Sequence, residues 1–246
     1  MPTAATISFG TKFTSGNNSF TNPAVSISTS SACKLIVVGF TISGTSASGF
    51  APTIGTDNFI KAGSTVATSE GNVEMWYMTT NTANRSENVT WRNKDGITHV
   101  ANISTYNSTA GISFETVGTT FSTSGTLANV TNTLQANTAS ITVSQYHSGY
   151  FTPTGVQNNG SVLYTLDRGS LIACSSYIVG TVETTRNLFW LTPSADDYAM
   201  TAASFISDDA PVPGGDLEWN TTAWNAIASI NGQSRLIVDT VNTVVT

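Results

Sequence analysis

The sequence predicts an all-β protein, built as an antiparallel two-sheet β-sandwich with a short, partly helical segment after it. Short segments in which apolar and polar residues alternate recur along the chain, and Gly, Asn, Pro and Ser separate them. No segment before residue 210 shows the apolar repeat of roughly three to four residues that a packed helix needs. Consecutive short strands with such connections are typical of sandwiches and barrels.

Residues 73–78 form the clearest predicted strand, with odd-numbered side chains on one face and even-numbered side chains on the other. The alternating segments 88–92 and 97–101 flank Lys94-Asp95-Gly96, and Asp-Gly at such a position predicts a hairpin because Gly tolerates positive φ. The other strands are expected at 5–9, 24–28, 35–42, 140–146, 161–166, 170–179, 187–191 and 198–206. The Gly- and Ser-rich segments 43–49 and 122–126 are interpreted as loops.

The composition changes near residue 210, where Asp208-Asp209 is followed by Ala-Pro-Val-Pro-Gly-Gly. Proline fixes an extended backbone and glycine frees it, so this stretch is typical of a linker. The sequence therefore predicts a sandwich domain over 1–210, and a linker with an anchoring or oligomerisation segment over 211–246.

Large apolar residues are concentrated in that C-terminal segment. Trp224, Ile227 and Ile230 recur at steps of three, which predicts a short helix that ends at Asn231-Gly232. Two tryptophans in so short a segment are hard to bury within it, and buried Trp is a frequent interface anchor. We therefore expect an interface formed by Trp219, Trp224, Ile227 and Ile230.

Charged residues make up only 10% of the 246 residues, against a usual value of about 25%. With 9 basic and 15 acidic residues, the chain has no Lys/Arg stripe for nucleic acid or for a membrane surface. Its apolar runs are too short for membrane insertion. The N-terminus lacks the pattern of a signal peptide. These features predict a protein made in a cytoplasm, with a surface of hydroxyls and amides that suits dense packing.

Catalytic and metal-binding patterns are weak, and no cofactor is expected. We expect the two histidines, His99 and His147, to have structural or surface roles, and no Gly-x-Ser-x-Gly elbow is present. The carboxylates of Asp208, Asp209, Asp216 and Glu218 lack the spacing of a calcium loop, as does the pair Asp196-Asp197. We expect Cys33 and Cys174 to be buried free thiols, although the sequence leaves a disulfide open. Trp76, Trp91 and Trp190 are expected to be core or half-buried.

Several short motifs resemble a β-sandwich domain of bacterial and bacteriophage surface and virion proteins. They are Val37-Val38-Gly39-Phe40, Gly71 to Tyr77, Asn88-Val89-Thr90, and Ser194 to Ala199, where Tyr198 replaces the Trp of that family. The resemblance spans about residues 25–207. It implies a jelly-roll type of sandwich without catalytic residues. The segment from Trp224 to Ser234 resembles short tail segments of phage structural proteins, which implies attachment to a partner or to another copy.

These observations predict a bacteriophage virion structural protein, either a capsid decoration protein or a tail-associated component. Its partners would be other virion proteins and further copies of itself, in a homo-oligomer exposed on the particle surface. The alternative hypothesis is a carbohydrate-binding adhesin, a tail fibre tip or bacterial surface module that binds a host-surface glycan. A hydrolase on a sandwich scaffold, with Glu74 and Glu115 as carboxylates, is the least favoured hypothesis.

Overall fold

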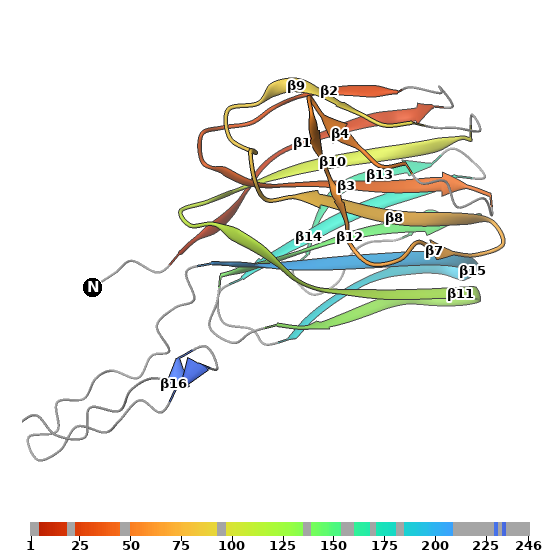
Figure 1. The fold of residues 1–246 in the computed structure, drawn as a ribbon. Coiled ribbons are helices and arrows are strands. Elements are labelled where there is room, and N and C mark those ends of the chain that lie inside the picture. The colour runs from red at the N-terminus through yellow and green to blue at the C-terminus, as the bar shows by residue number, and fades with distance from the viewer. Residues whose placement is uncertain are drawn as a thin grey trace, which may run out of the picture.

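Figure 1 shows the fold in a computed structural model, which describes residues 5–18, 23–44, 50–92, 97–134, 139–153, 160–167, 171–180, 185–208, 229–230 and 233–234. Every regular element in these residues is a β-strand, and the strands pair antiparallel. This confirms the predicted all-β class with antiparallel sheets. The predicted number of sheets is wrong, because three sheets rather than two make up the described sandwich.

The central sheet is six-stranded and runs in the order β1–β10–β3–β8–β6, with β7 also paired to β8. Its strands are β1 (Ile7–Asn18), β3 (Cys33–Ser43), β6 (Ile60–Lys61), β7 (Val66–Ala67), β8 (Gly71–Met78) and β10 (His99–Ser108). Both faces of β3 are buried, so Leu35 and Val37 contact one core while Ile36 and Val38 contact another. A strand buried on both faces reads as a continuous apolar run, which explains this sequence.

A four-stranded sheet covers one face of the central sheet. It runs in the order β2 (Ala24–Ser28), β9 (Ser86–Thr90), β4 (Thr53–Ile54) and β5 (Asp57–Asn58). Ile27, Ile54 and Val89 from this sheet pack in one core with Phe40 and Ile103 of the central sheet. In Figure 1 this layer lies at the top, over β1, β10 and β3.

A five-stranded sheet covers the other face. It runs in the order β11 (Ile112–Thr133), β15 (Thr185–Ser207), β12 (Ser140–Ser148), β14 (Ile172–Gly180) and β13 (Ser161–Asp167). Ile141, Val143 and Phe205 from this sheet share a core with Leu35 and Tyr106. The alternation predicted for 73–78 is confirmed, because Met75 and Tyr77 pack in this core and Trp76 and Met78 in the opposite one.

The ladder between β11 and β15 folds back on itself. Its register is interrupted between Ser122 and Leu127, and residues on either side of this bend then meet. Asn132 Nδ2 donates hydrogen bonds to the Ala202 carbonyl (2.9 Å) and to Ser204 Oγ (2.8 Å). We call the folded-back portion, residues 127–133 and 185–191, the arm. It covers the outer face of the five-stranded sheet, and in Figure 1 it forms the lowest layer.

The predicted hairpin around Lys94-Asp95-Gly96 is wrong. β9 pairs with β2 and β4, whereas β10 pairs with β1 and β3, so the two strands belong to different sheets. The chain crosses between layers here because Val89 and Ala101 both face the core between those layers. β11 was not predicted as a strand, and the interpretation of 122–126 as a loop was wrong, since β11 continues through it.

The segment 211–246 lies outside the described residues, except for β16 (Ser229–Ile230) and β17 (Gln233–Ser234), which pair antiparallel. The predicted helix therefore does not extend to Ser229 and Ile230. The dipeptide between these strands is Asn231-Gly232, a sequence typical of two-residue hairpin turns. The domain boundary at residue 210 stays a prediction.

Candidate functional site

The interface predicted from the C-terminal segment remains a prediction. Trp219, Trp224 and Ile227 lie outside the described residues, and of Ile230 only the backbone is described. The site that the structure offers must therefore be sought on the sandwich itself.

The three tryptophans of the sandwich do not form an exposed sugar-stacking face. Trp91 and Trp190 are 4% and 1% exposed, and Trp76 is half-buried, as the sequence predicts. The Trp76 indole donates to Glu74 Oε2 (3.2 Å), and Lys61 Nζ lies 5.5 Å from the ring centroid. All three therefore hold the fold together.

The two histidines are both fully buried, so of the structural or surface roles expected from the sequence the surface role does not apply. His99 Nε2 accepts a hydrogen bond from the Trp91 indole at 2.8 Å, and burial lowers the pKa of its imidazole. Burial lowers the pKa of His147 to about 4, although Asp197 and Asp196 oppose this shift. At neutral pH both rings are therefore neutral and enclosed, out of reach of a substrate.

The carboxylates of Asp196 and Asp197 hold a corner of the sandwich where β15 bends. Asp196 Oδ2 accepts hydrogen bonds from the backbone N–H groups of Tyr150 (3.1 Å) and Phe151 (2.9 Å) and from Ser148 Oγ. Asp197 Oδ2 accepts one from Ser69 Oγ (2.5 Å). Both residues are more than nine-tenths buried. Their carboxylates therefore stabilise the chain segments whose N–H and O–H groups donate to them. Within the described part of the chain, no group of three or more His, Cys, Asp or Glu is arranged to hold a metal ion.

The two carboxylates considered for glycoside hydrolysis have different surroundings, because one is enclosed in the sandwich and the other is exposed. Glu74 is 1% exposed and forms an ion pair with Lys61 at 2.9 Å. Glu115 is exposed on β11. A glycosidase needs two carboxyl groups flanking one bond, and this pair does not supply them.

An unprotected strand edge is the most distinctive surface of the sandwich. Among the described residues, β11 has a pairing partner on one side only, so it presents a row of unpaired backbone N–H and C=O groups. We call residues 119–133 the β11 edge. It contains no charged residue and no proline, the devices by which soluble proteins block such edges. Phe121 and Leu127 on it are 64% and 45% exposed.

The outer face of the arm next to this edge is also uncharged. Its exposed side chains are the hydroxyls and amides of Thr and Asn together with the apolar Leu127, and Thr131 Oγ1 donates to Asn187 Oδ1 across the two strands at 2.5 Å. Among the residues that the structure describes, the arm portion of β15 pairs with β11, and the pairing of β15 with β12 starts beyond the arm, at Tyr198. The sequence reasoning above missed this surface, although the lack of charge in 119–133 is visible in the sequence.

No helix among the described residues could span a membrane. Comparisons with protein-family models, with curated proteins and with solved structures gave no match. The fold and surface of the chain are therefore the basis for proposing its function.

Proposed function

We propose that the chain is a structural protein of a bacteriophage virion, a capsid decoration or tail-associated component that acts by protein–protein assembly and not by catalysis. The observation that carries this proposal is the β11 edge, a strand edge that bends between Ser122 and Leu127, carries no charge or proline and exposes Phe121. The resemblance of its short motifs to a β-sandwich domain of bacterial and bacteriophage surface and virion proteins supports it, and a jelly-roll connection of the strands is part of the same proposal.

The chemistry of this edge favours pairing with another polypeptide. A free edge in water costs little, but it offers backbone donors and acceptors to any strand that approaches. Lys or Glu side chains would oppose a second strand by desolvation and repulsion, and 119–133 has neither. Thr, Ser and Asn at exposed positions allow close packing without buried charge. The surface thus suits repeated contacts in a particle.

Charge placed on the edge tests the assembly mechanism. We would compare the full chain with a Thr119→Lys/Phe121→Lys variant by sedimentation velocity over a range of concentrations. Both residues are exposed, so the fold should persist. The pairing of β11 with a strand of another chain should be lost. We expect the unmodified chain to sediment as an oligomer and the variant as a smaller species.

The matched control is Asn88→Lys/Thr90→Lys. These residues are exposed on β9, which pairs with β2 along its whole length and with β4 at Val89 and Thr90. Assembly unchanged in the β11 variant would refute the edge as the contact. A chain that is absent from purified phage particles, measured by mass spectrometry, would refute the virion assignment.

A carbohydrate-binding adhesin is the second candidate, because two aromatic side chains are exposed beside a polar corner. Tyr150 and Phe151 are 66% and 37% exposed, next to the Asp196 carboxylate and Glu70. Aromatic faces with nearby acceptors can stack on and hydrogen-bond to sugars. A glycan array probed with the full chain tests this candidate, and a Tyr150→Ala variant should lose any binding that this corner provides.

A further inference from the structure

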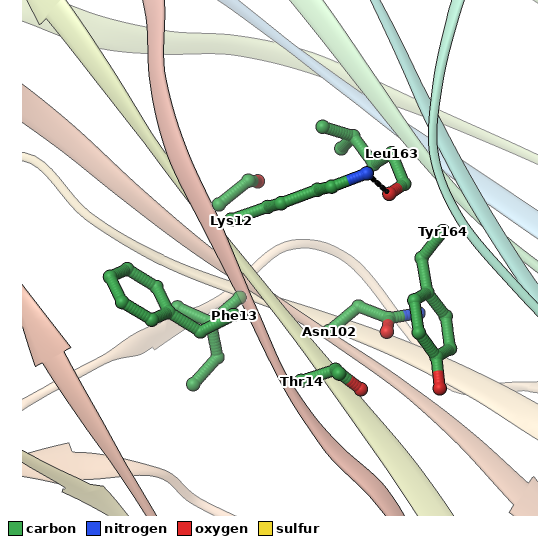
Figure 2. A pocket seen from close by; sticks show the side chains of 8 residues that line it. Lys12, Phe13, Thr14, Asn102, Leu163 and Tyr164 are labelled. Carbon is green, nitrogen blue, oxygen red and sulfur yellow. Dashed lines mark hydrogen bonds between the residues drawn. The ribbon is translucent and has the colours of Figure 1, made fainter.

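A pocket of about 260 Å³ lies where two sheet edges meet, apart from both the β11 edge and the Tyr150 corner. Strand β1 is an edge of the central sheet, and β13 is an edge of the five-stranded sheet. The lining side chains that matter here come from β1, β10 and β13. They are Lys12, Asn102, Leu163 and Tyr164, which Figure 2 labels, and Ser104. Pockets for drug-sized ligands measure about 300–1,000 Å³, so this one fits a single small ring.

Both strands at the mouth of the pocket depart from regular pairing. The register of β1 against β10 shifts on either side of the segment Lys12–Thr14. The register of β13 against β14 shifts between Val162 and Tyr164, which leaves Leu163 as the extra residue of a β-bulge. Bulges re-aim side chains and are frequent beside binding sites. Here both irregularities fall at residues that line the pocket.

Lys12 supplies a positive charge at this mouth. It is exposed and reaches across to β13, where its Nζ donates a hydrogen bond to the Leu163 carbonyl of the bulge (Figure 2). The ion pairs found among the described residues involve Lys61 and Arg85 but not Lys12. An ammonium group has three donors, so two remain for an anionic group.

Asn102 supplies a buried acceptor that the protein does not satisfy. Its side chain is 6% exposed, and its Oδ1 has no hydrogen-bond partner, whereas its Nδ2 donates to Gln145 Oε1 at 3.3 Å. A buried acceptor without a donor costs about 1–3 kcal/mol. Beside it, Ser104 Oγ accepts the Tyr106 hydroxyl at 2.9 Å and keeps its own hydrogen as a donor. A ligand with hydroxyl groups would satisfy both.

The Tyr164 ring lines the pocket together with Asn102 (Figure 2). It is half-buried, so its face can take the apolar side of a ring while its hydroxyl group reaches water. The pocket thus combines one cation, one unsatisfied acceptor and one aromatic face.

We propose that this pocket binds a single acidic sugar unit, a pyranose ring that carries a carboxylate, as in a uronic acid. Lys12 holds the carboxylate, Asn102 Oδ1 accepts a hydrogen bond from a ring hydroxyl, and Tyr164 covers the apolar face of the ring. This inference does not depend on assembly through the β11 edge.

The test is calorimetric titration of the full chain with methyl glucuronide and methyl glucoside, which differ in the carboxylate alone. We expect binding of the glucuronide in the millimolar range, and binding of the glucoside weaker by about tenfold, equivalent to about 1.4 kcal/mol. Lys12→Gln should weaken glucuronide binding by a similar factor and remove the difference between the two sugars. Lys34→Gln, on β3 and outside the pocket lining, is the matched control and should change neither affinity.

Three outcomes would overturn the proposal. If methyl glucuronide does not bind the folded chain, the pocket is not a sugar site. If the two sugars bind with equal affinity, the pocket does not recognise the carboxylate. Competition by acetate as strong as by glucuronide would reduce the pocket to an anion site. Tyr164→Leu serves as a second variant that leaves β1 unchanged. It should weaken the binding of both sugars without changing the ratio of their affinities.

Discussion

The indole of Trp190 lies against the ring of Tyr146, with 5.8 Å between their centroids and 29° between their planes. Its Nε1 also donates to Ser144 Oγ at 3.4 Å. Trp190 belongs to the arm, whereas Tyr146 and Ser144 lie on β12. This contact therefore holds the arm against the outer face of the five-stranded sheet.

Removal of this indole should release much of the arm. Trp190→Ala deletes a side chain that is 1% exposed, and such truncations cost about 3–5 kcal/mol. We expect that loss in the free energy of unfolding, measured by urea denaturation of the full chain. Phe121→Ala is the control, because Phe121 is 64% exposed and should change stability by less than about 0.5 kcal/mol. Equal effects of the two substitutions would contradict the packing of the arm.

The ion pair between Lys61 and Glu74 gives a second prediction. Glu74 is buried, and it also accepts hydrogen bonds from Thr65 Oγ1 (2.6 Å) and from the Trp76 indole. Lys61→Met would leave this carboxylate without its cation, a change that costs about 3–5 kcal/mol for buried pairs. Denaturation should show this loss, and the double variant Lys61→Met/Glu74→Gln should recover part of it. A double variant less stable than Lys61→Met would contradict the assignment.

The buried His147 predicts destabilisation in mild acid. The folded chain holds the pKa of His147 at about 4, against 6.5 for a free imidazole, so the unfolded chain binds more protons between these values. The free energy of unfolding should therefore fall as the pH drops from about 6.5 to about 4, by about 3 kcal/mol from this residue. His99 acts in the same direction.

Urea midpoints at pH 7 and pH 4.5 measure this effect. Relative to the unmodified chain, His147→Gln should narrow the difference between the two midpoints, because the residue that takes up the proton on unfolding is gone. The same difference in both proteins would show that other groups carry the acid sensitivity.

The two thiols should be unreactive in the folded chain. Cys33 and Cys174 are both free and fully buried, as expected from the sequence. Burial raises the pKa of both thiols, that of Cys174 to about 12, so little thiolate forms near neutral pH. Titration with DTNB should detect no thiol before denaturation and two per chain after it. Fewer than two in the denatured, unreduced chain would indicate a disulfide.

Much of the strand content could be predicted because many strands carry apolar residues in the period of a half-buried sheet. The strand predicted at 24–28 has the same bounds as β2 (Ala24–Ser28), and the strand predicted at 35–42 lies within β3. The run Leu35-Ile36-Val37-Val38 also indicates burial on both faces, from which a third layer could have been inferred. β11 was not predicted because its residues are mostly Thr, Ser and Gly, with few buried apolar side chains. Its backbone pairing with β15 makes it a strand, and the sequence alone does not show that pairing.

Strand pairing and the pocket could not be predicted for a different reason. An Asp-Gly dipeptide such as Asp95-Gly96 favours a turn, but it does not decide whether the flanking strands join one sheet or two. That choice depends on cores formed by residues distant in sequence, such as Val89 with Phe40. The pocket depends on bulges at β1 and at Leu163, and no residue pattern in those strands marks them.

The position of β15 has a consequence for how the chain reaches its native state. This strand lies between β11 and β12, so the interior of the five-stranded sheet is filled by a strand synthesised after both neighbours. Until Ser207 has left the ribosome, β12 can pair on one side only and Ile141 and Val143 lack Phe205. Closure over such long stretches of chain is slow, and the incomplete sheet is prone to associate with others. During synthesis the chain should therefore depend on chaperones more than its small size suggests.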